Sequence, residues 1–99
     1  MSIQHMVIFN LHAGKDTDEA RNFLSSSAEE LAGIPGVEQF QVLRQVSVKN
    51  DYDYGFSMVF ADQAAYDAYN SHPVHTRYVA ERWLKEVSRF QEIDFTVMA

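Results

Sequence analysis

The segment from Asp67 to Val79, DAYNSHPVHTRYV, concentrates side chains that could transfer protons. It contains His72 and His75, two of only four histidines in the chain, and Tyr69 lies six residues before His75. A neutral imidazole can accept a proton near pH 7, and a phenol can donate one to an oxygen that becomes an enolate or alkoxide. The segment therefore fits an acid–base site, a metal site, or an ordinary helix start that is rich in aromatic residues.

Pro73 predicts where a helix begins, and so what kind of base His75 would be. Proline suits the first helical position because it has no N–H and a fixed φ. His75 would then lie in the first turn, near the positive end of the helix dipole, which lowers the pKa of an imidazole. We hypothesise that His75 is a general base and Tyr69 an acid. In the competing interpretation, His75 hydrogen-bonds a backbone carbonyl and Tyr69 fills the rim of the core.

The other histidines have different predicted places. His5 shares a strand face with Val7 and Phe9, so it is either a core histidine with satisfied hydrogen bonds or a side chain that lines a cavity. His72 is expected beside the helix start, in a structural role. His12, at the end of its strand, is expected at the surface.

A metal site is an alternative to the acid–base site. His72 and His75 are three residues apart and His5 could supply a third nitrogen, a set that would suit Zn²⁺. The segment has no carboxylate beyond Asp67, and the chain has no cysteine. We therefore expect no metal, and because the chain has no phosphate loop and no dinucleotide-binding fingerprint we expect no cofactor either.

The remaining sequence predicts the elements that position these side chains. Periodicity and turn residues predict strands at 2–12, 37–48, 54–61 and 92–98, with helices at 16–33, 62–70 and 73–88. Asp16 is the expected N-cap of the first helix, with Glu19 completing a capping box. Ser25–Ser27 is expected on the solvated side of this helix and not as a nucleophile. The order β-α-β-β-α-β predicts an α+β, ferredoxin-like fold.

Composition and charge limit the classes of partner. The 99 residues, 46% of them hydrophobic, predict a single domain, 1–99, with one core. The net charge is −6 and the eight Lys and Arg are scattered, so neither nucleic acid nor an anionic membrane is an expected partner. The chain has no signal-peptide pattern and no apolar run of about 20 residues, so a cytoplasmic protein is expected.

The strand at 2–12 predicts a second subunit. One face carries Ile3, His5, Val7, Phe9 and Leu11, and the other still carries Met6 and Ile8. Helices can cover only one face of such a sheet, and an apolar face left in water would be larger than monomers usually tolerate. Two sheets packed face to face solve the problem, so we expect a homodimer.

Nearly the whole chain resembles the stress-responsive dimeric α/β-barrel (Dabb) family. The resemblance rests on IQHMVIFNL with His5, IPGV at 34–37, YGFSMVF at 54–60, AYNSHPVHTRYV at 68–79 and DF at 94–95. It implies a homodimeric α/β barrel. In a plant cyclase of this family, which performs an aldol condensation without a cofactor, the residues matching His75 and Tyr69 carry the acid–base role. The residue matching His5 lines the same pocket.

Two functions of different class follow. The first is a binding protein that holds a small apolar or aromatic, polyketide-like molecule between sheet and helices. The second is a cofactor-independent cyclase or lyase that uses His75 and Tyr69, with a cofactor-free monooxygenase as a weaker alternative. Where the chain departs from the cyclase, the pocket lining is expected to be altered by Met58, Tyr66, Arg77 and Trp83. The ligand-binding residues expected in either case are His5, Val7, Phe9, Tyr66 and His72.

Overall fold

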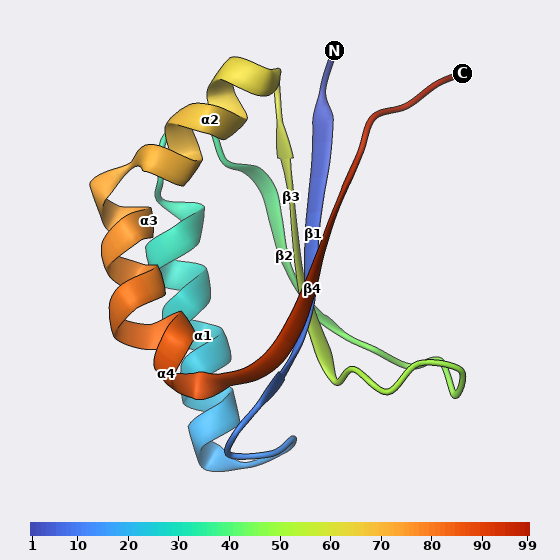
Figure 1. Cartoon of the computed structure of the whole chain (residues 1–99), viewed down its shortest axis with the longest axis vertical. Helices are drawn as coiled ribbons and strands as arrows, with labels where there is room; N and C mark the ends of the chain where they lie inside the picture. The colour runs from blue at the N-terminus through green and yellow to red at the C-terminus, as the bar shows by residue number, and fades with distance from the viewer.

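A four-stranded antiparallel sheet carries all the helices on one of its faces in the computed structural model, which describes residues 1–99 (Figure 1). The elements are β1 (Ile3–Leu11), α1 (Asp18–Ala32), β2 (Glu38–Arg44), β3 (Tyr54–Phe60), α2 (Gln63–Ser71), α3 (Pro73–Tyr78), the π-helix η1 (Val79–Trp83), α4 (Leu84–Glu86) and β4 (Val87–Phe95). The strand order is β2-β3-β1-β4. The predicted ferredoxin-like β-α-β-β-α-β plan is thereby confirmed.

The first helix begins one residue later than predicted. Thr17 is the N-cap, and its hydroxyl accepts a hydrogen bond of 3.1 Å from the Ala20 N–H. Asp16 instead has a left-handed backbone, with φ 61°, and its carboxylate accepts a 2.7 Å bond from Arg44. The predicted capping box of Asp16 and Glu19 is therefore wrong, because the chain turns at Asp16 before the helix starts.

Two strands differ from their predicted bounds. β2 ends at Arg44 and not at Val48, and Val46 and Val48 lie exposed in the loop that follows. β4 begins at Val87, five residues before the predicted start, because it pairs with β1 from Leu11 back to Gln4. The helical segment predicted at 73–88 accordingly stops at Glu86, and it contains an unpredicted π-helical turn.

The face of the sheet toward the helices is filled with aromatic side chains. Phe9, Phe56 and Phe60 of the strands and Phe23 of α1 are completely buried. Phe9 meets Phe23 edge to face, with 5.8 Å between the ring centroids. Aromatic contacts of this kind stabilise a core beyond the area that they bury.

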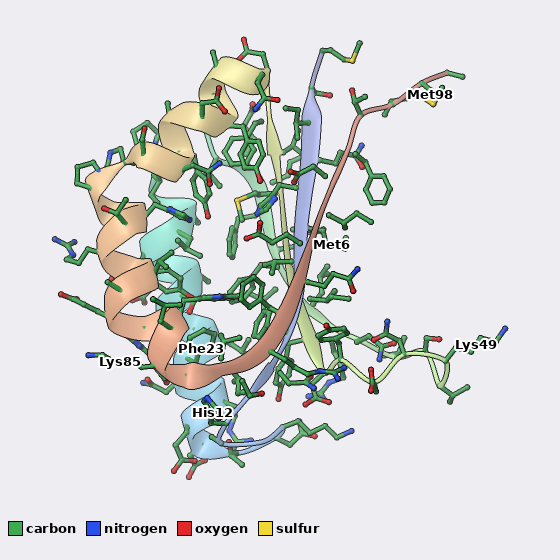
Figure 2. All side chains as sticks on the ribbon, in the orientation of Figure 1. Met6, His12, Phe23, Lys49, Lys85 and Met98 are labelled. Carbon is green, nitrogen blue, oxygen red and sulfur yellow. The ribbon has the colours of Figure 1, made fainter.

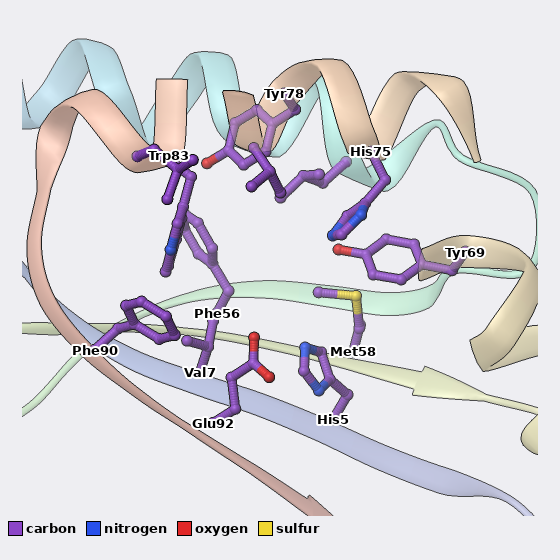
Figure 3. Close-up of a pocket in the computed structure, with 13 residues that line it drawn as sticks. His5, Val7, Phe56, Met58, Tyr69, His75, Tyr78, Trp83, Phe90 and Glu92 are labelled. Carbon is purple, nitrogen blue, oxygen red and sulfur yellow. The ribbon is translucent and has the colours of Figure 1, made fainter. Parts of the chain in front are cut away.

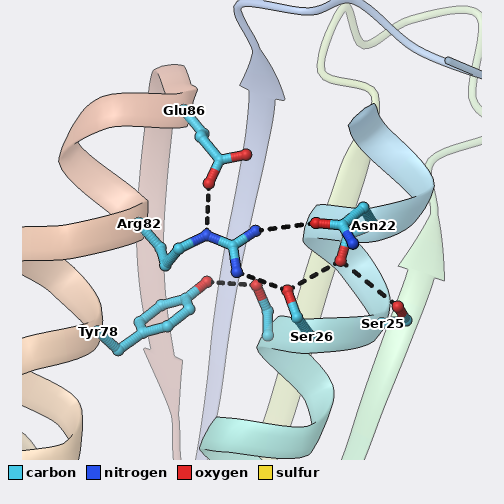
Figure 4. Close-up of polar contacts among 7 residues, drawn as sticks. Asn22, Ser25, Ser26, Tyr78, Arg82 and Glu86 are labelled. Carbon is cyan, nitrogen blue, oxygen red and sulfur yellow. Dashed lines mark hydrogen bonds and ion pairs between the residues drawn. The ribbon is translucent and has the colours of Figure 1, made fainter. Parts of the chain in front are cut away.

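Ser27 is also completely buried, so its predicted place on the solvated side of α1 is wrong. Its hydroxyl lies 2.6 Å from the Tyr78 hydroxyl, and this pair joins α1 to α3 (Figure 4). A buried hydroxyl is tolerated when it is hydrogen-bonded, and here each hydroxyl satisfies the other.

Arg82 makes a second connection to α1. Its guanidinium donates to Ser26 Oγ at 2.8 Å, and its Nε donates to Glu86 Oε2 at 2.5 Å (Figure 4). The Arg82 side chain is therefore occupied by hydrogen bonds within the helical layer.

The second face of the sheet has no covering element. We call it the open face and define it by Met6, Ile8, Ile93 and Phe95. Met6 pairs with Ile93 across β1 and β4, and Ile93 and Phe95 are 43% and 53% exposed. Figure 2 shows Met6 pointing away from the helices, on the opposite side of the sheet from Phe23. No helix has the length and hydropathy that a membrane span requires.

Candidate functional site

A cavity of about 250 Å³ lies between the sheet and the helical segment that runs from α2 to α4 (Figure 3). Ten of its 13 lining residues are hydrophobic, and the three others are His5, His75 and Glu92. Leu84 and Phe90, at its rim, are 68% and 48% exposed. Pockets that are mostly apolar with a few convergent polar groups are the usual form of a small-molecule site.

The junction between α2 and α3 positions Tyr69 and His75. α2 ends at Ser71, and Pro73 is the first residue of α3, as predicted. His72 joins them: its N–H donates to the Tyr69 carbonyl at 3.1 Å, and its Nδ1 accepts from the Val74 N–H at 3.1 Å. The two helices consequently meet at an angle that brings the rings of Tyr69 and His75 together, with 4.4 Å between their centroids.

The hydrogen bonds of this pair leave its reactive atoms available. His75 Nδ1 lies 3.2 Å from the Asn70 carbonyl oxygen, which can only accept, so Nδ1 carries the proton and Nε2 is the free acceptor in the neutral ring. The Tyr69 hydroxyl has no protein partner, and since no buried side-chain polar atom lacks one, it is open to the cavity. Figure 3 shows the hydroxyl and the imidazole directed toward each other at one wall.

Burial sets the protonation states of the pair. Desolvation by burial lowers the pKa of His75, which is the direction predicted from its place near the helix start. Desolvation also raises the pKa of Tyr69 well above its ordinary value. At neutral pH the site therefore pairs a neutral imidazole with a protonated phenol.

His5 is held by a second polar cluster on the opposite wall. The ring is buried, and its Nδ1 lies 2.6 Å from Asp94 Oδ1 and 3.0 Å from the Tyr66 hydroxyl. An ionised carboxylate only accepts, so Nδ1 donates to Asp94 and Nε2 is free on the cavity side. Burial and the neighbouring Asp94 raise the pKa of Tyr66, which keeps its hydroxyl protonated.

Only some of the predicted site residues share the cavity. His5, Val7, Tyr69 and His75 line it. Of the departures from the cyclase, Met58 and Trp83 also line it, whereas Arg77 is exposed and does not.

The other predicted ligand-binding residues lie outside the lining. Phe9 is behind it in the core, with its ring centroid 5.0 Å from that of Trp83. Tyr66 lies behind His5, and His72 is the cap described above. His12 is exposed, as predicted. The three histidines of the alternative zinc site are not assembled, since no three His, Asp or Glu residues lie close enough together to hold a metal.

The sequence prediction missed the contribution of β4. Phe90, Glu92 and Asp94 alternate along this strand and face the helices, because Glu92 pairs with Val7 and Asp94 with His5. The alternation of these residues with Ile93 and Phe95 is visible in the sequence. It does not show which set faces the cavity, and apolar residues normally face inward.

Residues 3–97 match the stress responsive A/B barrel domain (Dabb) family. A Dabb family protein with a ferredoxin-like fold from Mesorhizobium loti is 46% identical, with a TM-score of 0.96 over 99% of this chain and 98% of that chain. No protein with a curated description matches the sequence significantly.

Two more distant structures share the fold. A dimeric ferredoxin-like protein of unknown function from Thermobifida fusca is 17% identical, with a TM-score of 0.78 over 98% of this chain and 92% of that chain. A hydroxynitrile lyase from Passiflora edulis is 7% identical, with a TM-score of 0.82 over 98% of this chain and 94% of that chain. The family match over residues 3–97 and the close structural relative lead to one conclusion: the chain belongs to the stress responsive A/B barrel domain (Dabb) family.

Proposed function

We propose that this protein binds a small apolar or aromatic molecule in the cavity between its sheet and its helices. The observation that carries the proposal is the lining, in which hydrophobic side chains surround a few polar groups from opposite walls. An apolar cavity of about 150 Å³ is large enough to hold benzene, so a cavity of about 250 Å³ can accept a somewhat larger ring system.

We also propose that the binding unit is a homodimer. Ile93 and Phe95 on the open face leave apolar area that only another chain can cover, and a second copy is the commonest partner. The dimeric relative from Thermobifida fusca, which has the same fold, supports this assembly.

Proton transfer without a cofactor is the second candidate function, and the pairing of Tyr69 with His75 favours it. In an aldol-type closure, His75 Nε2 would remove a proton from the carbon next to a carbonyl. The resulting enolate carbon would form a bond to a second carbonyl carbon, and Tyr69 would donate its proton to the new alkoxide oxygen. In lyase chemistry the same base would remove a hydroxyl proton, the oxygen would form a carbonyl as the carbon–carbon bond breaks, and the departing carbon would leave with the electron pair as an anion that takes up a proton from Tyr69 or the imidazolium. The lyase from Passiflora edulis supports the use of this fold for such chemistry.

Native mass spectrometry of protein taken gently from its source cells tests the first proposal. We expect a dimer that carries the mass of a small molecule. A monomer would contradict the homodimer, and a cavity that takes up no ligand from the cells or from an aromatic library would contradict the binding function.

Two substitutions separate the binding protein from the enzyme. If the pair performs chemistry, His75→Ala should abolish turnover of the captured ligand class while affinity changes little, and Tyr69→Phe should slow turnover with the ring still in place. If the protein only binds, His75→Ala should change affinity or nothing, with no turnover by the wild type.

A further inference from the structure

Glu92 is the only charged side chain that lines the apolar cavity, apart from the two histidines. It lies opposite Val7 in the pairing of β4 with β1, so the register of the sheet fixes its position. Figure 3 shows its carboxylate pointing into the cavity, between Val7 and His5. It takes part in none of the ion pairs of the protein, which join other residues.

The lining contains no lysine or arginine. Arg82, the arginine closest in sequence to the lining residue Trp83, is bound to Glu86 and Ser26. Any positive charge on His5 is matched by Asp94 at 2.6 Å, and burial favours the neutral form of His75. A ligand whose polar group lies beside Glu92 therefore meets a negative charge that no lysine or arginine of the lining offsets, at a position of β4 that is exposed in the single chain.

The charge of Glu92 affects which class of ligand the cavity can bind. A carboxylate ligand would bring a second negative charge beside Glu92, with no lysine or arginine of the lining to balance it, and like charges placed side by side at a binding site weaken affinity. A hydroxyl or amino hydrogen would instead donate to the Glu92 carboxylate in a charge-assisted hydrogen bond. We infer that Glu92 selects uncharged ring compounds that carry a hydroxyl or amino donor, and excludes carboxylic acids. This inference rests on the proposed binding function of the cavity.

Three naphthalene compounds and one fluorophore test the inference. Trp83 lines the cavity and is the only tryptophan, so quenching of its emission reports occupancy directly. We would titrate the dimer with naphthalene, 2-naphthol and 2-naphthoate, which differ only in the polar group. The wild type should bind 2-naphthol at least roughly tenfold more tightly than 2-naphthoate, since opposing like charges at a binding site weaken affinity by about that factor or more.

Glu92→Gln removes the charge and keeps the shape, so it should bring the two affinities within about twofold of each other. Glu29→Gln, at an exposed position of α1 outside the lining, removes one charge and should keep the wild-type ratio. Glu92→Lys should reverse the preference in favour of 2-naphthoate, which gives a second readout if the Gln variant folds poorly.

The outcomes separate the inference from the function on which it rests. If naphthalene and 2-naphthoate both bind the wild type, with 2-naphthoate as tight as 2-naphthol, the cavity function stands and the role of Glu92 is overturned. The role of Glu92 is likewise overturned if Glu92→Gln leaves the ratio unchanged. If none of the three compounds, naphthalene included, changes Trp83 emission, both the cavity function and the inference are overturned.

Discussion

The two faces of the sheet are formed by the same strands but bury their apolar side chains to different extents. On the helix side, Phe9 and Phe56 are completely buried within one chain. On the open face, Ile93 and Phe95 keep about half of their surface in water, although they lie on a strand that is paired along its length. The first face stabilises the protomer, and the second can gain comparable burial only through another chain. Apolar alternation along a strand thus marks burial without saying which chain provides it.

A substitution in the core on the helix side of the sheet should cause the largest loss of stability. Phe23→Ala would remove a ring that lies within 6.3 Å, centroid to centroid, of the rings of Phe9, Phe56 and Trp83. We expect a loss of about 3–5 kcal/mol in the free energy of unfolding, because the surrounding rings cannot collapse into the space. Urea denaturation measures this loss, with the exposed Val48→Ala as the control. A cost under about 1 kcal/mol would mean that the helix layer packs differently.

A substitution on the open face should weaken the dimer and leave the fold of each chain intact. Ile93→Glu places a charge opposite Met6 where we propose that two sheets meet. We expect the dimer to weaken by about 2–4 kcal/mol, as at a central interface position, while each chain keeps its fold. Sedimentation velocity would report the mass and circular dichroism the fold. The loop variant Val48→Glu should remain dimeric. An unchanged dimer for Ile93→Glu would place the interface elsewhere.

The hydroxyl pair of Ser27 and Tyr78, between α1 and α3, should make a smaller contribution to stability, which a double-mutant cycle can measure. Ser27→Ala removes the partner of the Tyr78 hydroxyl and leaves that group unsatisfied, which should cost about 1–3 kcal/mol. The double variant with Tyr78→Phe removes both hydroxyls and should recover much of that loss. Chemical denaturation of the four proteins in this cycle measures the coupling. If the double variant is as unstable as the sum of the two single variants, the hydroxyls do not act as a pair.

The smallest expected effect depends on pH. Burial lowers the pKa of His75 below its ordinary value of 6.5, so the unfolded chain binds this proton more tightly than the folded chain. Folding stability should therefore fall as pH falls below 6.5 toward the folded pKa.

His75→Gln lacks this titration, so the stability of the wild type relative to the variant should decline on acidification from about pH 7.5 to about pH 5. His12→Gln, at an exposed position, is the control. A rise in relative stability on acidification would show that the folded protein favours the imidazolium.

The parts that were predictable from sequence are those with a local cause. Pro73 starts α3, as predicted, and Asp62 caps α2 where that helix was predicted to begin, because the ring or side chain acts on its own helix turn. Asp16 and Thr17 are adjacent residues that can both cap, and in the structure Asp16 instead binds the distant Arg44.

The rest depended on partners that are distant in sequence. Ser27 is buried because Tyr78 faces it, 51 residues later, and a serine in an amphipathic helix gives no sign of this. Glu92 lines the cavity and Asp94 binds His5 because of the register between the first and last strands. The π-helical turn at Val79–Trp83 has no Gly or Pro to mark it.

The double role of His72 has a consequence for how this protein can change in length. This one residue ends α2 and begins α3, so the number of residues between Tyr69 and His75 fixes the angle at which their rings meet. Inserting or deleting one residue there would turn the imidazole by about 100° around its helix. The exposed loop at residues 45–53 has no such link to the cavity. Homologous genes should therefore vary in length at that loop and keep a constant spacing across His72.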